Sequence, residues 1–385
     1  MNYYVAGGAV RDMLLGRAFR DVDYLVVDSE QHFLQRNPAA RKIQSVPAPI
    51  YLLHGQEYTV LDPAGQGPEA MLHQDLLRRD FTINALLLSE SGILRAHRHS
   101  FADLREKRLR PASATALADD PVRIFRAARF AAMLPDFSVH EDVLVQMRAA
   151  AQLGSCAAIA AEQVGKECLK ALACARPGNF LRLLQDTGCL GPWFAELEGA
   201  DSIPAGPERY HSLSVFGHSA RLMDSVARTA LDDAAGERER CLAVWMALCH
   251  DLGKCATPGE MLPRHIGHEK RGISMARDLG LRLRLPRLYI RAGEEACALH
   301  MKGGIYPGLR PGTRVDLLMR LHGANPAFIR PFCRLAAADS GNAELPDIIL
   351  RDYARILAVR LPRQWRDLGA ESGRQLRELR CAALV

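Results

Sequence analysis

Two acidic residues near the start of the chain have a spacing that suits metal-assisted chemistry. Asp21 and Asp23 lie two positions apart at the beginning of an apolar run. Side chains at i and i+2 of a strand point from the same face, so both carboxylates can reach one ligand. Such a pair holds divalent metal ions against a nucleotide triphosphate. We therefore expect Asp21 and Asp23 to be catalytic and to bind Mg²⁺.

A glycine-rich turn precedes the acidic pair in Val5-Ala-Gly-Gly-Ala-Val-Arg-Asp12. A glycine pair after an apolar strand lets the backbone approach phosphate oxygens closely. The helix expected to open near Ala9 directs its free N–H groups to the same place, and Arg11 adds a positive charge. With a metal ion bridging the phosphates and the attacking hydroxyl, the predicted reaction is nucleotidyl transfer rather than peptide cleavage or hydride transfer.

Two further motifs carry groups suited to a nucleotide. In the segment 75–85, Arg79 can fork onto phosphate oxygens, while Asp80 and Asn84 offer an acceptor and an amide for ribose hydroxyls. The segment 119–129 then opens a helical region. Asp120 and Arg123 together present donors and acceptors in a plane, as a base edge would, and could read cytosine or adenine. A helix cap with a surface ion pair is the alternative. Three arginines share one side of that helix: Arg123, Arg126 and Arg129.

Histidines and aspartates form a second constellation in the C-terminal half. Imidazole and carboxylate ligands spread over consecutive helices suit one or two transition-metal or magnesium ions with open positions for water. Such a site hydrolyses phosphoesters. An ordinary helix surface is the alternative for the His-Asp pair taken alone. His265 belongs to the same region. The predicted metal ligands are His218, His250, Asp251, His268, His300 and Asp339.

The elements that must position these groups change character along the chain. Short apolar, β-rich runs alternate with helical stretches in the first 110 residues, which predicts a small mixed sheet. After Ala118 the apolar residues follow a 3.6-residue period. We therefore predict an α+β fold, a mixed sheet followed by an all-helical remainder. The expected strands are Tyr3–Val5, Tyr24–Val27, Ile50–Leu53, Tyr58–Leu61 and Ala85–Leu88; the first expected helices are Arg123–Met133, Glu141–Ala151, Ala161–Leu172 and Phe180–Thr187.

Four domains are expected on this pattern, with boundaries at 1–115, 116–200, 210–345 and 346–385. The stretch 199–208 is rich in proline and glycine and separates two helical blocks. In the last domain Arg374, Arg377 and Arg380 recur every three residues, which fits a solvated helix face or RNA contact.

The composition of the chain indicates where the protein is located and which kinds of partner it binds. The chain has 385 residues, 48% of them hydrophobic and 24% charged, as expected of a globular protein. No apolar run approaches the roughly 18 residues that span a bilayer, and the N-terminus is strand-like rather than a leader. Ten cysteines without a Cys-x-x-Cys pair suit a reducing compartment, so we expect a cytoplasmic protein without membrane association. A net charge of +6 favours a polyanionic partner, above all nucleic acid.

The order and spacing of four motifs resemble the class II tRNA nucleotidyltransferases, the CCA-adding enzymes, whose bacterial relatives include poly(A) polymerases. The motifs are Gly7-Gly-Ala-Val-Arg-Asp12, Asp21-Val-Asp23, Arg78-Arg-Asp-Phe-Thr-Ile-Asn84 and Asp120-Pro-Val-Arg123. The resemblance covers the whole chain as head, neck, body and tail. It implies a nucleotidyltransferase head at 1–115 and a helical neck and body at 116–200.

The resemblance also implies roles for individual residues. Asp21 and Asp23 would hold magnesium, and Gly8 and Arg11 would contact the triphosphate. Asp120 and Arg123 would act as the protein template that selects CTP or ATP. The incoming nucleotide would also be bound by Arg79, Arg126 and Arg129.

The histidine set resembles the HD phosphohydrolases. His250-Asp251-Leu-Gly-Lys254 matches their signature, and His218 and Asp339 fall in the expected order. Some bacterial class II enzymes carry this extra domain, with 2′,3′-cyclic phosphodiesterase, 2′-nucleotidase and phosphatase activities. The resemblance implies the same potential at 210–345, with Mg²⁺ or a transition metal such as Ni²⁺.

The function expected from these motifs is CCA addition or repair at the tRNA 3′ end from CTP and ATP. The terminal hydroxyl attacks the α-phosphate and pyrophosphate leaves. The expected partners are the tRNA acceptor arm, CTP and ATP, and no obligatory protein partner is evident. Arginine-rich helical blocks at 282–291 and 310–334 would hold the acceptor arm through its backbone.

Three departures from the family pattern are visible: two, at Asp62 and His97, bear on the last step, and one, at Gln163, bears on the support of the template helix. Asp62 stands where relatives have an arginine, and only about a dozen residues, Pro63 to Gln74, separate it from the Arg-Arg-Asp motif. In the family a longer loop there helps the switch from C to A. His97 ends a segment where Asp-Pro is usual, and Gln163 replaces a helical arginine. The hypothesis is that addition of the terminal A is weak or missing, as in CC-adding members.

Other readings stay open. The transferase site could have decayed, which would leave an HD phosphohydrolase acting on RNA ends. A tRNA-binding module without turnover is a third possibility, although the intact acidic pair argues against it. Poly(A) addition shares the head motifs and is not excluded by them.

Overall fold

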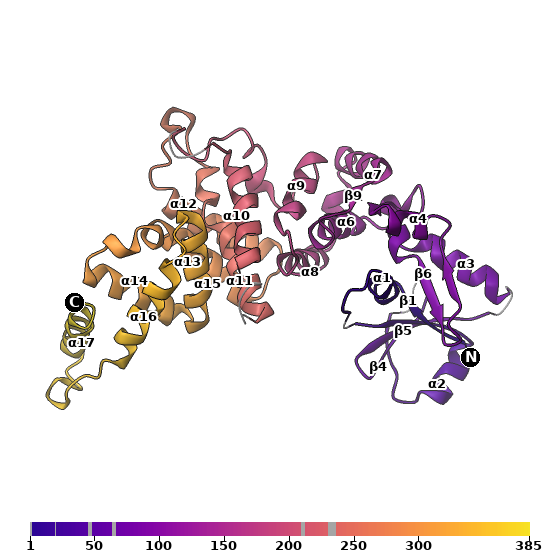
Figure 1. Ribbon diagram of the computed structural model, residues 1–385, viewed down its shortest axis with the longest axis horizontal. Helices are drawn as coiled ribbons and strands as arrows, with labels where there is room; N and C mark the ends of the chain where they lie inside the picture. Colours follow the sequence, from indigo (N-terminus) through magenta and orange to yellow (C-terminus); the bar gives the residue numbers. More distant parts are fainter. Residues whose placement is uncertain (1, 20, 45–47, 64–66, 209–211, 230–235) are drawn as a thin grey trace. The chain divides into compact units, whose positions relative to one another are not determined.

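The computed structural model describes residues 2–19, 21–44, 48–63, 67–208, 212–229 and 236–385 (Figure 1). The chain forms two compact units. Unit 1 comprises Met1–Ala127 and Asp136–Ser155, and unit 2 comprises Ala128–Pro135 and Cys156–Val385. The described part of the chain contains no helix long and apolar enough to cross a membrane.

Unit 1 is built on a mixed seven-stranded sheet with the order β3-β4-β5-β2-β1-β6-β7. β2 and β5 pair in parallel, and the other neighbours pair antiparallel. The five strands predicted from the sequence are confirmed. Two edge strands were not predicted, because β3 is exposed at all four positions and β7 has only three residues. The strands are β1 Asn2–Ala6, β2 Asp23–Val27, β3 Arg41–Gln44, β4 Ile50–Leu53, β5 Gln56–Leu61, β6 Leu86–Ser89 and β7 Leu94–Ala96.

Alternation along β2 divides its side chains between two hydrophobic clusters. Leu25 and Val27 pack with Leu72 and Leu76 of α3 (Pro68–Arg78). Val26 packs on the other face with Phe33 of α2 (Glu30–Arg36), and with residues of β4 and β5. Because side chains two apart share a face, Asp23 lies on the same face as Leu25 and Val27. The sheet thus places the acidic pair at the N-terminal end of a central strand.

Shorter elements complete unit 1. The first helix, α1, follows the Gly-Gly turn. The single-turn 3-10 helix η1 precedes β6, at the end of the Arg-Arg-Asp motif. A two-stranded parallel ladder, β8 with β9, joins segments on either side of α6. These elements are α1 Gly8–Leu14, η1 Thr82–Asn84, α4 Ser100–Arg105, β8 Arg108–Leu109, α5 Ala116–Asp119, β9 Ser138–Val139 and α7 Glu141–Gln152. α6 (Arg123–Met133) begins in unit 1 and ends in unit 2.

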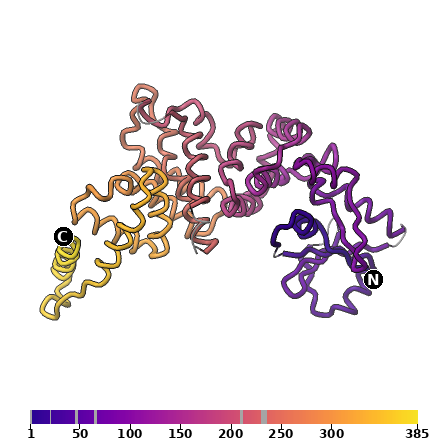
Figure 2. The backbone as a smooth tube through the Cα atoms, in the orientation of Figure 1, coloured from indigo at the N-terminus to yellow at the C-terminus, as the bar shows by residue number. Residues whose placement is uncertain are grey.

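Unit 2 is helical throughout its described residues, which confirms the predicted α+β class for the chain. α11 lies at its centre and packs against α10, α13 and α15 (Figures 1 and 2). Every residue from Cys241 to Cys249 of α11 is buried, as expected of a helix that is apolar on all sides. The helices are α8 Ala161–Leu172, α9 Gly178–Asp186, α10 Val215–Thr229, α11 Glu237–Cys249, α12 His268–Arg282, α13 Arg287–Gly304, α14 Pro311–Ala324, α15 Ile329–Ser340, α16 Leu345–Ala358 and α17 Ala370–Ala382.

Single-turn 3-10 helices join these elements in unit 2. They are η2 Ser155–Ala158, η3 Ala195–Leu197, η4 Leu252–Lys254, η5 Gly259–Met261, η6 Tyr306–Gly308, η7 Pro326–Phe328 and η8 Arg363–Trp365, the first residue of η2 being the last of unit 1.

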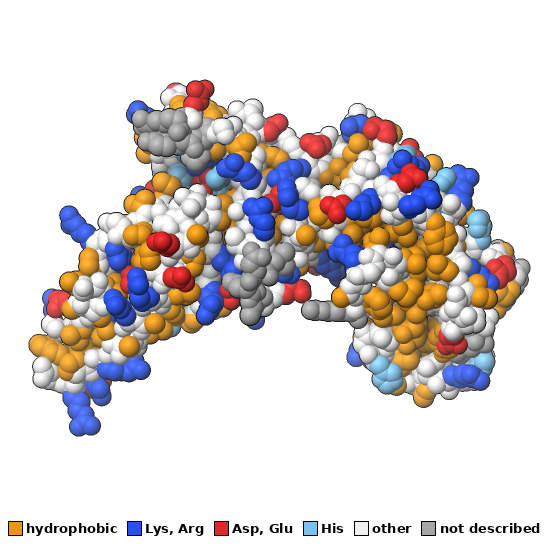
Figure 3. All heavy atoms as spheres, in the orientation of Figure 1, with side chains coloured by type: hydrophobic (Ala, Val, Ile, Leu, Met, Phe, Trp, Pro, Cys, Tyr) orange, Lys and Arg blue, Asp and Glu red, His pale blue; other side chains and the backbone are white. Residues whose placement is uncertain are grey.

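The surfaces of the two units differ in character. On the face shown in Figure 3, hydrophobic side chains gather over the sheet of unit 1, whereas lysine and arginine side chains are scattered among acidic ones over unit 2. All ten cysteines are free, and seven of them are buried, so most of them act as small core residues.

The segment after β5 is shorter than the sequence indicated. α3 begins at Pro68, so Pro68 to Gln74 belong to a helix rather than to a loop. Only Asp62–Gly67 connects the two elements, and residues 64–66 lie outside the described part of the chain. The helix was missed because Pro and Gly dominate its approach, although Pro is favoured in a first helical turn.

Candidate functional site

The glycine turn of unit 1 is held in a conformation that favours glycine. Gly7 has φ 67°, and a Cβ there would lie 2.9 Å from Arg79 Nη1. Arg79 is fixed by its Nε, which donates to Asp75 Oδ2 at 2.9 Å, and by Nη1, which donates to the Asn84 carbonyl at 3.3 Å. The structure therefore brings the guanidinium of the Arg-Arg-Asp motif directly against the Gly-Gly turn.

A buried polar chain links three of the sequence motifs within unit 1. Arg11 forks onto Asp12 at 2.7 and 3.0 Å and donates from Nη1 to Asn84 Oδ1 at 2.7 Å. Asn84 Nδ2 donates to Asp80 Oδ1 at 3.0 Å, and Arg126 Nη2 lies 3.0 Å from Asp80 Oδ2. Burial would raise the pKa of Asp80, but Arg126 and the hydrogen bond from Asn84 hold it below its usual range. The polar atoms expected to meet a ribose are thus engaged inside the protein.

The acidic pair lies in a different environment from this network. Both Asp21 and Asp23 are exposed, and Asp23 is the first residue of β2. Burial of part of its carboxylate and the negative charge of Glu57 raise the pKa of Asp23; Asp21 also raises it, while Arg79 and Arg126 lower it. Clustered carboxylates repel one another, so this site gains from a bound cation. The donor set fits Mg²⁺, which prefers carboxylate oxygens.

Glu57 is a candidate site residue that the sequence reasoning missed. β2 and β5 are parallel neighbours with Tyr24 opposite Tyr58, so the preceding residues Asp23 and Glu57 lie at adjacent positions. The acidic residue at the start of β5 was visible in the sequence. What the sequence could not supply was the pairing of β2 with β5, because the chain passes through two other strands between them.

The contacts of Asp120 and Arg123 fit both alternatives that the sequence left open, a helix cap with an ion pair and a planar edge that reads a base. Asp120 Oδ1 accepts from the Val122 N–H at 3.2 Å, as in a cap, and Arg123 Nε lies 3.7 Å from Asp120 Oδ2. Arg123 also donates to the carbonyls of Ala116 at 3.0 Å and Arg78 at 2.6 Å. The guanidinium is therefore anchored, while the Asp120 side chain is 46% exposed and can meet a ligand.

Arg129 lies in unit 2 and is supported there by α8. Its Nε donates to Glu167, and both side chains are nearly buried. Gln163, which replaces a family arginine, precedes Glu167 by four positions on α8. Glu167 is therefore the residue of α8 that supports α6, through its contact with Arg129.

The second constellation converges at the centre of unit 2. His218 lies on α10, His268 begins α12, and His300 lies on α13. His250 is the C-terminal cap of α11 and is followed by Asp251. Asp339 is on α15, and it alone of the six is appreciably exposed, at 23% of its side chain. Five helices thus bring all six predicted ligands together.

The ligand atoms fall into two groups that share Asp251. His218 and His250 face each other with Nε2 atoms 3.3 Å apart, and His250 Nε2 lies 3.1 Å from Asp251 Oδ2. His268 and His300 face each other at 3.1 Å, each with Nε2 3.4 Å from Asp251 Oδ1. One group is His218, His250 and Asp251, and the other is Asp251, His268 and His300. The ligand atoms of each group lie close enough together to bind one metal ion.

Backbone carbonyls orient the imidazoles for this role. Nδ1 of His250 lies 2.8 Å from the Ala247 oxygen, and Nδ1 of His268 lies 2.7 Å from the His265 oxygen. A neutral imidazole that donates from Nδ1 presents a lone pair at Nε2. Two facing Nε2 lone pairs about 3 Å apart repel unless a cation, either a proton or a metal ion, lies between or beside them. Asp251 Oδ1 is buried without a hydrogen bond among the described residues, which also fits a metal ligand.

The carboxylates of the centre stay ionised. Burial would raise the pKa of Asp251, but the charge and hydrogen bond of His250 hold it well below its usual range. Burial also raises the pKa of Asp339, but the hydrogen bond with His218 and the charge of His250 outweigh this effect. The pKa of Asp339 therefore falls to about 2. Both groups therefore supply negative charge for one or two divalent ions.

The His-Asp-Leu-Gly-Lys segment has a structural reason for its glycine and lysine. A Cβ on Gly253 would lie 1.9 Å from the His268 oxygen, so the segment packs against the start of α12. Lys254 Nζ lies 2.8 Å from both Asp251 Oδ2 and the Ala205 oxygen. His265 lies beside the centre, but its nitrogens are bonded to Thr257 and to the Pro204 oxygen, each at 2.8 Å. His265 is therefore a support and not a ligand.

Comparisons with known proteins agree with this geometry. Residues 209–325 match the HD domain family model. The chain is 33% identical to a multifunctional CCA protein of Xanthomonas campestris, over 100% of this chain and 97% of that protein. It is 34% identical to a multifunctional CCA protein of Methylococcus capsulatus, over 100% of this chain and 94% of that protein.

Solved structures share the fold. A CCA-adding enzyme with CTP superposes with a TM-score of 0.64 at 19% identity, covering 100% of this chain and 87% of that one. A Thermotoga maritima CCA-adding enzyme complexed with tRNA gives 0.63 at 18% identity, covering 99% and 87%. The fold is that of a tRNA nucleotidyltransferase, here combined with an HD domain. The chain belongs to the family of the multifunctional CCA proteins.

Proposed function

We propose that this protein adds C and A nucleotides to the 3′ end of tRNA by metal-dependent transfer from CTP and ATP. The observation that carries the proposal is the exposed acidic pair at the start of β2, next to a Gly-Gly turn that is braced by Arg79. Membership of the multifunctional CCA family supports it. The partners proposed are CTP, ATP and the acceptor arm of tRNA.

The head residues divide the reaction between them. Asp21 and Asp23, with Glu57 beside them, would hold Mg²⁺, which when bound activates the terminal hydroxyl and neutralises charge on the leaving pyrophosphate. Arg79 adds a guanidinium at the turn, where the triphosphate would lie. Gly8 and Arg11 would shape that turn. The buried bonds from Arg11 to Asn84 support a positioning part for Arg11.

Base selection is proposed for the beginning of α6. Asp120 is exposed and Arg123 is anchored on two carbonyls beside it, so the pair can present a fixed edge to cytosine or adenine. Arg126 and Arg129 are proposed to support the incoming nucleotide from the same helix. The pairing of Arg126 with Asp80 connects this helix to the Arg-Arg-Asp motif within unit 1.

A second activity, phosphoester hydrolysis, is proposed for the HD centre. His218, His250, Asp251 and Asp339 would hold one divalent ion, and Asp251, His268 and His300 a second, with Mg²⁺ or Ni²⁺ as candidates. Such ions generate a nucleophilic hydroxide when bound. Lys254 holds Asp251 in place through its 2.8 Å contact. Phosphate groups at RNA ends, such as 2′,3′-cyclic phosphates, are the substrate class proposed.

The domain division at 1–115, 116–200, 210–345 and 346–385 is part of the same proposal, with the HD match at 209–325 in its support. A cytoplasmic location is also proposed, because ten free cysteines suit a reducing compartment.

The decisive experiment supplies tRNA lacking CCA, ending in C or ending in CC with CTP, ATP or both, and reads the products at nucleotide resolution. CCA addition predicts extension to a single defined end. Long runs of A would instead identify poly(A) addition, and no extension would leave the HD activity alone. The short connection after Leu61 favours a second candidate, a CC-adding enzyme. Efficient addition of ATP to tRNA ending in CC would rule that candidate out.

A further inference from the structure

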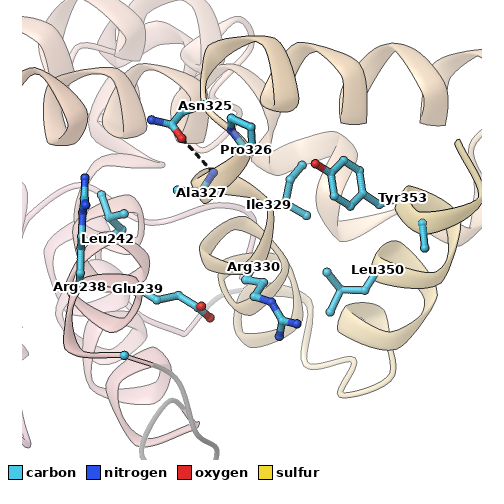
Figure 4. A pocket seen from close by; sticks show the side chains of 12 residues that line it. Arg238, Glu239, Leu242, Asn325, Pro326, Ala327, Ile329, Arg330, Leu350 and Tyr353 are labelled. Carbon is cyan, nitrogen blue, oxygen red and sulfur yellow. Dashed lines mark hydrogen bonds between the residues drawn. The ribbon is translucent and has the colours of Figure 1, made fainter. Parts of the chain in front are cut away.

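A cavity of about 720 Å³ in unit 2 lies apart from both candidate sites. It is surrounded by the beginnings of α11 and α15 and by α16 (Figure 4). α11 ends just before His250, and Asp339 lies next to the last residue of α15. The cavity therefore lies at the opposite ends of two helices that lead to the metal centre. One helix of 13 residues spans about 20 Å.

Two arginines line this cavity without a partner among the residues that the structure describes. Neither Arg238 nor Arg330 makes a hydrogen bond or ion pair with the residues that the structure describes, although both line the cavity. Arg334 Nε lies 3.2 Å from Glu239, which is the acidic group of the lining. The negative charge of Glu239 is thus already matched, and Arg238 and Arg330 give the described part of the lining a net positive charge.

The rest of the lining is mostly apolar and includes one fixed aromatic ring. Tyr353 OH is bonded to His322 Nδ1 at 2.7 Å, which holds the ring at the wall of the cavity. Leu350 stands on the same helix, and Ile329 lies next to Arg330 (Figure 4). A pocket of several hundred cubic ångströms with an apolar wall and a few polar groups suits a small ligand. Guanidinium groups recognise phosphate, and an aromatic ring with aliphatic neighbours accepts a base.

We propose that this cavity binds a mononucleotide, with its phosphate at Arg330 and its base against Tyr353 and Leu350. Arg238 adds positive charge on the α11 side. The size of the cavity accommodates one nucleotide, and two exposed guanidiniums without a partner among the described residues favour an anion. The site is separate from the nucleotide site of the head and from the HD centre, and it does not depend on either activity.

The test is photolabelling of the full-length protein with 8-azido-AMP, followed by peptide mapping. We expect label on the peptides that contain Tyr353 or residues 325–330, and excess AMP should suppress it. Adenosine, which lacks the phosphate, should compete roughly tenfold less well, because a charge-assisted contact is lost. Arg330→Gln and Arg238→Gln should each lower this labelling by roughly the same factor.

Arg351→Gln is the matched control, since this exposed arginine of α16 does not line the cavity. It should leave the labelling unchanged, and label on head peptides should persist in all three variants. Absence of label on the cavity peptides, or label indifferent to AMP and to both cavity variants, would overturn the proposal. Displacement by tRNA but not by AMP would also overturn it, because the occupant would then be an RNA phosphodiester.

Discussion

The transferase site and the HD centre differ in how completely the fold assembles them. In unit 2, ligand atoms from five helices lie within 3.1–3.4 Å of their nearest neighbours, almost entirely buried. In unit 1 the acidic pair is exposed, and the nearby arginines are engaged with protein partners. Helix packing alone can therefore bring a complete set of candidate metal ligands together. At the site proposed to admit a triphosphate and an RNA end, the carboxylates lie at the surface and the nearby cations are held by protein partners.

The largest effect is expected when an exposed carboxylate of the transferase site is removed. Asp23→Asn should lower nucleotide addition by about a thousandfold or more, because a ligand of the catalytic ion is lost. The change is isosteric and at the surface, so the melting temperature should stay nearly constant. Phosphohydrolase activity on a 2′,3′-cyclic nucleotide should be unchanged. Loss of both activities would show that the two sites are not independent.

The reciprocal change removes a buried ligand. His300→Gln should lower the phosphohydrolase rate by about a hundredfold or more and reduce the metal content measured by plasma mass spectrometry. Nucleotide addition by the same preparation should persist. His265→Gln is the control, because His265 supports the centre without facing Asp251. It should retain more metal than His300→Gln, and equal loss in both would contradict the ligand assignment.

Glu57 offers a smaller test on the head side. Glu57→Gln removes one of the negative charges next to Asp23, so nucleotide addition should fall by about tenfold if Glu57 helps to hold the ion. The pKa of Asp23 should move down, because Glu57 raises it. A pH profile of addition under limiting Mg²⁺ measures this shift. Unchanged addition at every Mg²⁺ concentration would remove Glu57 from the site.

The smallest effect is expected at the glycine turn, where strain and contact can be separated. Gly7→Ala places a side chain at positive φ and within 2.9 Å of Arg79, whereas Gly16→Ala meets φ 64° with nothing within 4 Å. Both should lose about 1 kcal/mol of stability in denaturant unfolding. Only Gly7→Ala should also raise KM for CTP, by a few fold, because Arg79 must move. Equal KM values would contradict the proposed bracing.

Much of this arrangement was predictable from residue patterns. The bounds of α6 and α8 match those read from the 3.6-residue period, and the six histidines and aspartates predicted as ligands lie close together. Long-range pairing was not predictable. Glu57 became visible only when β5 lay beside β2, and His265 was separated from the ligands only by its bonds to Thr257 and Pro204. The head polar network joins Arg11 to Asn84 across 73 positions, which no local pattern can indicate.

The distribution of the cysteines allows the opening of unit 2 to be measured through its own thiols. All ten thiols, from Cys156 to Cys381, belong to unit 2, and unit 1 has none. Cys297 Sγ lies 3.0 Å from the Cys249 oxygen, and Cys249 directly precedes His250 of the HD centre. A thiol reagent can reach such a buried group only when the surrounding helices separate. The rate at which the seven buried thiols are modified therefore measures the opening of unit 2 alone in the intact protein, because unit 1 has no thiol.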